Sequence, residues 1–176
     1  MLKKGLVQVY TGDGKGKTTC AFGQALRAVG RGLKVCIFQF LKDEKLGSGE
    51  VMAFQHFKDN VRIVRGCQTH PMLALREQPG LKSEVLEMFE EIKKVLISGQ
   101  YDMVVLDEIN NCVDSGLLDV ARVMEIIKIK PSHTELILTG RGAVREIVEL
   151  ADLVTNMSLV KHPFKDGVKA RKGIEY

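Results

Sequence analysis

Residues 11–19, TGDGKGKTT, combine the residue types that bind phosphate in proteins. Glycines let a turn bring successive backbone N–H groups toward one anion, a lysine adds a full positive charge, and a threonine hydroxyl can reach a magnesium ion. An apolar run precedes the turn and a helical pattern follows it, so a helix N-terminus adds partial positive charge. We therefore predict a phosphate-binding loop, with candidate nucleotide-binding residues Gly12, Asp13, Gly14, Lys15, Gly16, Lys17, Thr18 and Thr19.

The spacing of this loop departs from the general phosphate-loop signature at one position. The signature is Gly-x-x-x-x-Gly-Lys-[Ser/Thr]. Gly16, Lys17 and Thr18 match it, whereas Thr11 stands at the first glycine. A glycine-rich turn with only a structural role is the alternative. The strand, turn and helix follow one another as a phosphate site requires, which favours phosphate binding.

Two acidic residues follow another apolar run, in YDMVVLDEIN. Asp107 and Glu108 come at its carboxyl end, where a carboxylate can hold Mg²⁺ directly or through water, opposite the phosphate loop. Taken alone, such a pair is also typical of a loop start or a helix cap. Together with the phosphate loop, it predicts a site for a nucleoside triphosphate with magnesium.

Two arginines are further candidates for binding phosphate. Arg141 lies between Gly140 and Gly142 after an apolar run, where glycines let the backbone approach a ligand and a guanidinium offers a planar fork. An exposed arginine in a tight turn is the alternative. Arg27 lies in ALRAVGRG, ten residues beyond Lys17 on the predicted helix that leaves the loop.

The elements that must position these residues alternate between strand and helix. Continuous apolar runs predict strands buried on both faces, as in a parallel sheet, at 6–10, 34–40, 61–65, 103–107, 135–139 and 153–160. Apolar residues at helical spacing predict helices at 17–30, 48–57, 81–98, 118–129 and 143–150. We expect an α/β fold with a doubly wound, mostly parallel sheet, in one domain spanning 1–176.

Charge and cysteine spacing limit the function classes. Of the net charge of +4, a net +3 lies in the basic C-terminal segment 161–176, so we expect no nucleic-acid-binding face. No apolar run reaches about 18 residues and the start resembles no signal peptide, so we expect no membrane partner. The four cysteines form no Cys-x-x-Cys pair, which argues against zinc and disulfides and favours the cytoplasm.

Five motifs in order, TGDGKGKTT, ALRAVGRG, VVLDEIN, TGRG and VKHPFKDGVKARKGIEY, closely resemble the corrinoid (cobalamin) adenosyltransferases of the P-loop type. The resemblance runs from about residue 5 to residue 176 and implies a recombinase-like P-loop nucleotide-binding fold. It also implies a reaction: transfer of the 5′-deoxyadenosyl group of ATP to the Co(I) of a corrinoid, with release of triphosphate. The threonine at the first glycine position belongs to this family's version of the loop.

The resemblance further implies roles for residues and partners. The loop would bind triphosphate, with Lys17 bearing most of the developing charge; Thr18 and Glu108 would organise Mg²⁺, and Asp107 would support them. Arg27 and Arg141 would hold phosphate or ribose oxygens, so that Lys17, Glu108 and Arg141 are the candidate catalytic residues. The basic tail would pack near the nucleotide or across the boundary of a homodimer. A corrinoid-reducing protein would supply Co(I).

The chain departs from the family at two places. Longer relatives carry an N-terminal extension, and relatives place aromatic residues where this chain reads GCQTHPM, with His70 as the conspicuous substitute. We interpret His70 as a solvated loop histidine, with a cobalt ligand as the alternative. The long segment 67–80 also leaves two other functions open. One is a P-loop ATPase or small-molecule kinase without corrinoid activity, and the other is an ATP-dependent corrinoid carrier.

Overall fold

Six parallel strands form one sheet in the computed structural model of the chain, which describes residues 2–42, 48–66 and 80–175. The strand order is β3-β2-β4-β5-β1-β6, and every neighbouring pair is parallel. The prediction of a parallel α/β sheet is confirmed. The strands are β1 (Val7–Thr11), β2 (Val35–Gln39), β3 (Val61–Arg65), β4 (Met103–Asp107), β5 (Glu135–Thr139) and β6 (Leu153–Asn156).

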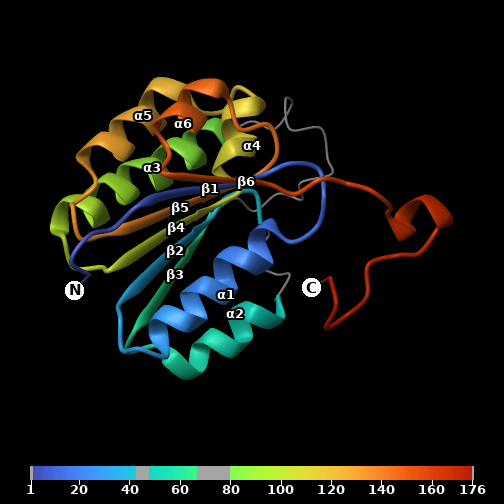
Figure 1. Cartoon of the computed structure of the whole chain (residues 1–176), viewed down its shortest axis with the longest axis horizontal. Coiled ribbons are helices and arrows are strands. Elements are labelled where there is room, and N and C mark those ends of the chain that lie inside the picture. The colour runs from blue at the N-terminus through green and yellow to red at the C-terminus, as the bar shows by residue number, and fades with distance from the viewer. Residues whose placement is uncertain (1, 43–47, 67–79, 176) are drawn as a thin grey trace.

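Helices cover both faces of the sheet, as the doubly wound prediction requires (Figure 1). The pair α1 and α2 lies on one face, and α3, α5 and α6 lie on the other with α4. Each face has its own apolar cluster, so β2, β4 and β5 are buried on both sides. The helices are α1 (Lys17–Val29), α2 (Gly49–Phe54), α3 (Leu81–Ser98), α4 (Ile109–Asp114), α5 (Val120–Ile129) and α6 (Arg145–Leu150), with short 3₁₀ turns η1 (Gln55–Phe57) and η2 (Pro163–Asp166).

The carboxyl ends of the central strands bring the candidate motifs together. Residue 11 ends β1, Asp107 ends β4 and Thr139 ends β5, and these three strands lie side by side in the sheet. In open parallel sheets, ligands bind outside the carboxyl ends of the strands. The phosphate loop, the acidic pair and the Arg141 turn therefore share one edge, here called the carboxyl edge.

Three elements differ from the expectations. Residues 109–114 form α4 and 163–166 form η2, both of which are too short to show helical periodicity. The last strand ends at Asn156 instead of Val160, and all of its residues are exposed. Among the described residues it pairs with β1 alone, so no described strand shields its outer edge.

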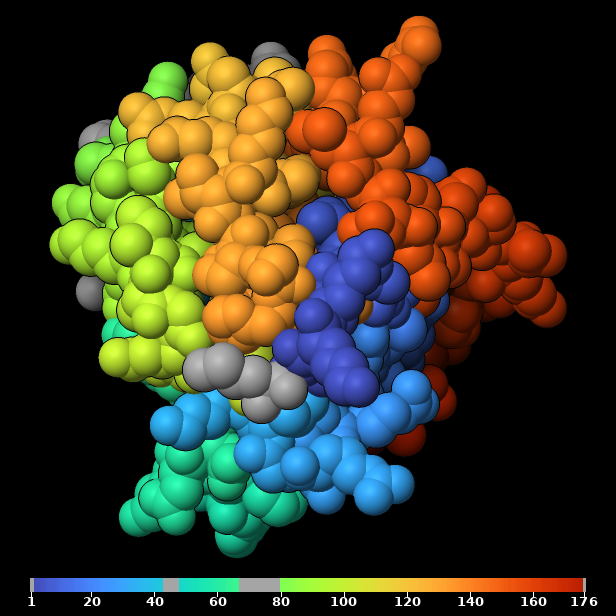
Figure 2. Space-filling view, turned by 60° about the vertical axis from the view of Figure 1, so that its left-hand side comes forward, coloured from blue at the N-terminus to red at the C-terminus, as the bar shows by residue number. Residues whose placement is uncertain are grey.

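The chain beyond β6 extends away from the sheet. Figure 1 shows residues 157–175, here called the C-terminal arm, projecting from the body before the chain turns back. Figure 2 shows the opposite terminus lying on the surface between other segments, where Gly5 accepts a hydrogen bond from Lys130 Nζ at 3.0 Å. Among the helices that the structure describes, none has the length and apolarity needed to cross a membrane. The segment 67–79, with His70, lies outside the described residues.

Candidate functional site at the carboxyl edge

The phosphate loop holds its lysine inward. Lys17 opens α1 directly after Gly16, whose φ of 121° requires a glycine. The Lys17 ammonium is buried and donates to Gly12 O at 2.5 Å and Gly14 O at 2.8 Å. Burial lowers the pKa of Lys17, and the nearby Glu108 opposes that shift. The charge is thus held at the start of α1 by the loop itself.

The outer face of the loop packs against the beginning of the C-terminal arm. The Gly14 N–H donates to Met157 O at 2.7 Å, and the Met157 N–H donates to Thr11 O at 2.8 Å. A Cβ at residue 12 would lie 2.2 Å from Asn156 Oδ1, and one at residue 14 would lie 2.7 Å from Met157 O. Two loop glycines are therefore required by this close approach.

The threonine at the first signature position has a structural explanation. Thr11 is the last residue of β1 and pairs with Asn156 of β6, so it needs no special backbone conformation. Its Oγ1 accepts a hydrogen bond from Ala143 N at 3.2 Å, which links the phosphate loop to the turn after β5. A glycine there would lose this link.

Asp107 is the centre of a hydrogen-bond network between three strands and α1. Its side chain is fully buried. Its Oδ1 accepts from Thr18 Oγ1 at 2.9 Å and from Thr139 Oγ1 at 2.7 Å, and its Oδ2 accepts from Gln39 Nε2 at 3.1 Å. Sequence reasoning found Asp107 and Thr18 but missed Thr139 and Gln39, whose only sequence signal is a polar residue at the end of a buried strand.

Glu108 is held in an unusual backbone conformation beside this network. Its φ is 68°, a region that L-residues other than glycine rarely adopt, and its N–H donates to Thr139 Oγ1 at 2.9 Å. Burial raises the pKa of the Glu108 carboxyl, with a further contribution from Asp107. Among the described residues, no hydrogen bond or ion pair engages this carboxylate, and a cation would relieve its charge.

The oxygen ligands at this point suit magnesium. A threonine hydroxyl and two carboxylates, from Thr18, Asp107 and Glu108, are hard donors of the type that Mg²⁺ prefers. Within the parts of the chain that the structure describes, no group of three or more His, Cys, Asp or Glu forms a metal cage. The set thus fits an ion that keeps waters and shares phosphate oxygens with a nucleotide.

The Arg141 turn is fixed to α4. The Arg141 N–H donates to Asn111 Oδ1 at 2.6 Å. Gly140 adopts a φ of 130°, and a Cβ at this position would lie 2.6 Å from Asn111 Oδ1. The guanidinium is exposed, and its Nε lies 3.9 Å from Asp13 Oδ1 of the phosphate loop. Arg141 is thus anchored through its backbone, and its exposed side chain lies at the rim of the phosphate loop.

The structure does not bring Arg27 to the phosphate loop. Arg27 lies exposed in the last turn of α1. At 1.5 Å per residue, it stands about 15 Å along the helix from Lys17, which exceeds the reach of an arginine side chain. Thr19 is exposed in the first turn, and Lys15 points outward to Ile174 O and Glu175 Oε1, both at 3.1 Å. That Arg27 holds phosphate or ribose oxygens of the nucleotide stays a prediction.

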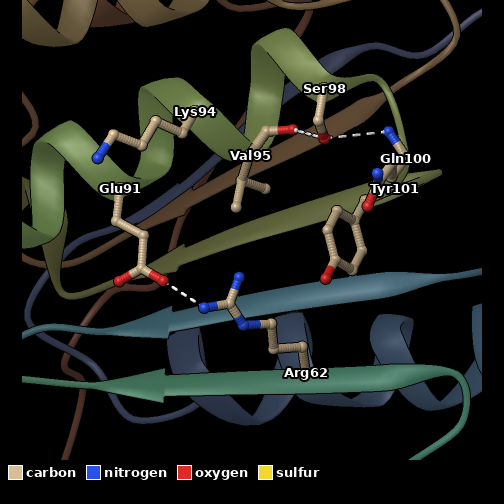
Figure 3. A pocket seen from close by; sticks show the side chains of 7 residues that line it. All are labelled: Arg62, Glu91, Lys94, Val95, Ser98, Gln100 and Tyr101. Carbon is tan, nitrogen blue, oxygen red and sulfur yellow. Dashed lines mark hydrogen bonds and ion pairs between the residues drawn. The ribbon is translucent and has the colours of Figure 1, made fainter.

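A separate hollow of about 260 Å³ lies away from this edge (Figure 3). Arg62 of β3 forms an ion pair with Glu91 of α3 there, and Tyr101 lies at the other side. Arg62 is the second residue of β3, near the amino end of the strand, opposite the carboxyl edge. None of the predicted site residues lines it.

Comparisons with known proteins agree on one family. The family model described as "ATP:corrinoid adenosyltransferase BtuR/CobO/CobP" matches residues 3–176. A corrinoid adenosyltransferase of Pseudomonas aeruginosa is 38% identical over 175 residues, covering 99% of this chain and 85% of the relative. One from Escherichia coli K12 is 35% identical over 179 residues, covering 99% and 87%.

A solved structure supports the fold independently. The KaiC-like protein of Pyrococcus horikoshii OT3 matches with a TM-score of 0.57 at 15% identity, over 88% of this chain and 73% of that one. At that identity the likeness concerns the fold alone, and it agrees with the recombinase-like P-loop architecture. With its full-length family match and these relatives, the chain belongs to the ATP:corrinoid adenosyltransferase family.

Proposed function

We propose that the carboxyl edge transfers the 5′-deoxyadenosyl group of ATP to the Co(I) of a corrinoid and releases triphosphate. The observation that carries this proposal is the buried Lys17 ammonium, held over the start of α1 beside the Thr18–Asp107 hydrogen bond, in a chain of this family. Because every part of the site comes from one sheet, we also propose that 1–176 act as one domain.

The chemistry asks little of the protein as a reactant. The Co(I) electron pair forms the cobalt–carbon bond to C5′, the C5′–O bond breaks, and its electrons leave with the triphosphate, so cobalt is formally oxidised to Co(III). No protein nucleophile or general base is needed. The protein contributes orientation of C5′ and stabilisation of the charge on the leaving triphosphate.

Lys17 and the loop 12–19 would hold the triphosphate. A buried ammonium with a depressed pKa is already desolvated, so little reorganisation is needed when charge develops on the leaving group. Arg141, anchored by its backbone and exposed at its guanidinium beside Asp13, would contact phosphate or ribose oxygens. These assignments extend the family relationship to individual residues.

Thr18 and Glu108 would hold Mg²⁺, with Asp107 supporting both. When bound, the ion would add positive charge to the triphosphate and orient it. Thr18 Oγ1 has its proton directed to Asp107, and the Glu108 backbone is fixed through Thr139. The Thr18 hydroxyl and the Glu108 backbone are therefore held in place without the ion.

A homodimer is the proposed assembly, with β6 and the C-terminal arm as its contact. No strand of the described residues pairs with the outer edge of β6, and the arm leaves large apolar side chains in water, with Val160 95% and Phe164 67% exposed. An unpaired strand edge and exposed apolar side chains suit a partner that is always available to cover them, and a second copy of the chain is such a partner. The five Lys/Arg of 161–176 also lie on this arm.

We propose a corrinoid-reducing protein as a transient partner, because the reaction needs Co(I). The cytoplasm is the proposed compartment. Among the described residues, Cys20 and Cys36 form no disulfide, which suits its reducing conditions.

The proposal is tested by incubating the protein with Mg²⁺–ATP and chemically reduced corrinoid, without air. Triphosphate together with the spectrum of an adenosylated corrinoid is expected. ADP and phosphate with unchanged corrinoid would instead establish an ATPase or kinase. A perturbed corrinoid spectrum without turnover would establish a carrier. The family match does not favour either of these alternatives.

A further inference from the structure

A glutamine at the end of the buried strand β2 is not explained by packing. Gln39 is 1% exposed, and the whole of β2 is buried. Its Nε2 donates to Asp107, whereas its Oε1 has no partner among the described residues. A buried polar atom without a hydrogen bond destabilises a protein, and methionine would fill similar space without that atom.

The hydrogen bond of Gln39 holds the second oxygen of Asp107. Both hydroxyl donors, Thr18 and Thr139, meet Oδ1, so Oδ2 depends on the Gln39 amide, at 3.1 Å. Without that donor, the described side-chain network leaves Oδ2 free to turn, and rotation of the carboxylate would move Oδ1 away from both hydroxyls. Gln39 is thus the group that fixes the plane of the carboxylate.

Both proposed magnesium ligands depend on that plane. A threonine hydroxyl has one proton and two lone pairs, so a proton donated to Asp107 leaves lone pairs for a cation. Thr139 donates to the same Oδ1 and accepts the Glu108 N–H, so it fixes the backbone of the second ligand. The chain of contacts runs from Gln39 through Asp107 to Thr18 and to Glu108.

We propose that Gln39 is a positioning residue for Mg²⁺–ATP: by holding Asp107 Oδ2, it keeps the Thr18 hydroxyl and the Glu108 backbone in the orientation that receives the ion. Gln39 is buried and touches neither nucleotide nor ion. The proposal rests on the proposed function, which assigns Thr18 and Glu108 to the ion.

Binding of ATP without corrinoid isolates this role from turnover. We would measure the ATP dissociation constant by calorimetry in Mg²⁺ and in EDTA, and take the ratio as the magnesium enhancement. For Gln39→Met, we expect the enhancement to fall about tenfold while affinity in EDTA stays at the wild-type value, as for loss of a hydrogen bond to a charged group. Gln39→Glu turns an oxygen toward Asp107 and should reduce the enhancement at least as much.

Gln8 supplies the matched control. It is also a buried strand glutamine, and its Nε2 donates to Glu135, the first residue of β5, at the amino end of the sheet. Gln8→Met therefore removes the hydrogen bonds of Gln8 with Glu135 and Tyr10, which are not part of the Asp107 network, and should leave the enhancement unchanged. Circular dichroism and melting temperature establish that each variant is folded.

Two results would overturn the proposal. The first is an unchanged enhancement in folded Gln39→Met, and the second is an equal loss of affinity in Mg²⁺ and in EDTA, which a merely structural role would produce. Thr18→Val separates the two proposals. If its enhancement falls while that of Gln39→Met does not, only the role of Gln39 is wrong; if Thr18→Val is also unchanged, the magnesium assignment fails with it.

Discussion

The carboxyl edge and the C-terminal arm differ in how their residues are held. At the edge, Asp107 accepts three hydrogen bonds from three different elements, and Lys17 is buried against two loop carbonyls. In the arm, Leu159, Val160 and Phe164 are exposed. The edge is therefore preorganised by its own chain, whereas the arm offers surface to another molecule.

The contrast teaches where a substitution acts. A change at the edge removes a group from a connected network, so its effect spreads to several neighbours. A change in the arm would alter the proposed contact with a second copy of the chain and leave the sheet intact. The following predictions test that division.

The largest effect is expected for Lys17→Ala. Removal of a preorganised charge beside the leaving triphosphate should lower turnover by about 10²-fold or more. Lys128→Ala is the control, because Lys128 is exposed in the last turn of α5, away from the phosphate loop. Steady-state kinetics with reduced corrinoid measure both. Near-normal turnover of Lys17→Ala would remove this lysine from the mechanism.

Glu108→Gln should raise the Mg²⁺ concentration needed for half-maximal activity by about tenfold. The amide keeps the shape of the side chain but loses the negative charge that binds a hard cation. A magnesium titration measures the change, with Glu149→Gln as control, since Glu149 is exposed and paired with Arg145 on α6. An unchanged titration would show that Glu108 does not bind the ion.

The two arginines predicted together should now separate. Arg141→Ala should weaken ATP binding about tenfold, because the guanidinium lies at the rim of the phosphate loop and a charge-assisted hydrogen bond to phosphate is of that order. Arg27→Ala should change it less than twofold, because Arg27 lies at the far end of α1. Calorimetry measures both. Equal losses would mean that Arg27 reaches a nucleotide in some other way, for example in a dimer.

Truncation after Val160 should abolish the dimer while changing ATP affinity only a few-fold. The shortened chain keeps residues 156–158, which contact the phosphate loop, and loses most of the arm. Sedimentation velocity gives the oligomeric state and calorimetry the affinity. A truncated chain that remains dimeric would move the subunit contact elsewhere.

The smallest effect concerns the end of the arm. Hydrogen bonds from Arg171 lower the pKa of Glu175 to about 2. Because this pKa lies below the ordinary carboxyl pKa, the ionised Glu175 stabilises the ordered arm fully at a pH above the ordinary pKa. The contact of Glu175 with Lys15 should therefore persist on acidification and be lost as pH falls through about 2. Carbon-13 NMR of the Glu175 carboxyl measures this, and a normal titration near 4.5 would refute it.

The sequence predicted correctly those site residues that directly follow a recognisable strand or begin a recognisable helix. The phosphate loop joins a strand to a helix, and Asp107 ends a buried run, so the parallel sheet was sufficient to bring Thr18 and Asp107 together. The helix at 81–98 was found to the residue because its apolar stripe is long. Periodicity works best over several turns.

The partners that came from distant strands could not be read in advance. Gln39 and Thr139 meet Asp107 only because β2 and β5 flank β4, an order that the sequence does not reveal. Arg27 illustrates the opposite case: it is near Lys17 in sequence, but α1 carries it along the helix axis to the last turn, so its role at the nucleotide stays a prediction. Local proximity and spatial proximity differ most at helix ends.

The packing of Asn156 and Met157 against Gly12 and Gly14 sets a boundary for protein engineering. A tag, fluorophore or fused domain placed after Ser158 would keep the contacts of Asn156, Met157 and Ser158 with the phosphate loop, and replacing the arm would remove only those of Ile174 and Glu175 with Lys15. An insertion only two residues earlier would push side chains into a gap that already excludes a single methyl group. The shortest functional fragment of this chain should therefore end at Ser158, and libraries of fusion proteins should show a sharp loss of ATP binding on the other side of that residue.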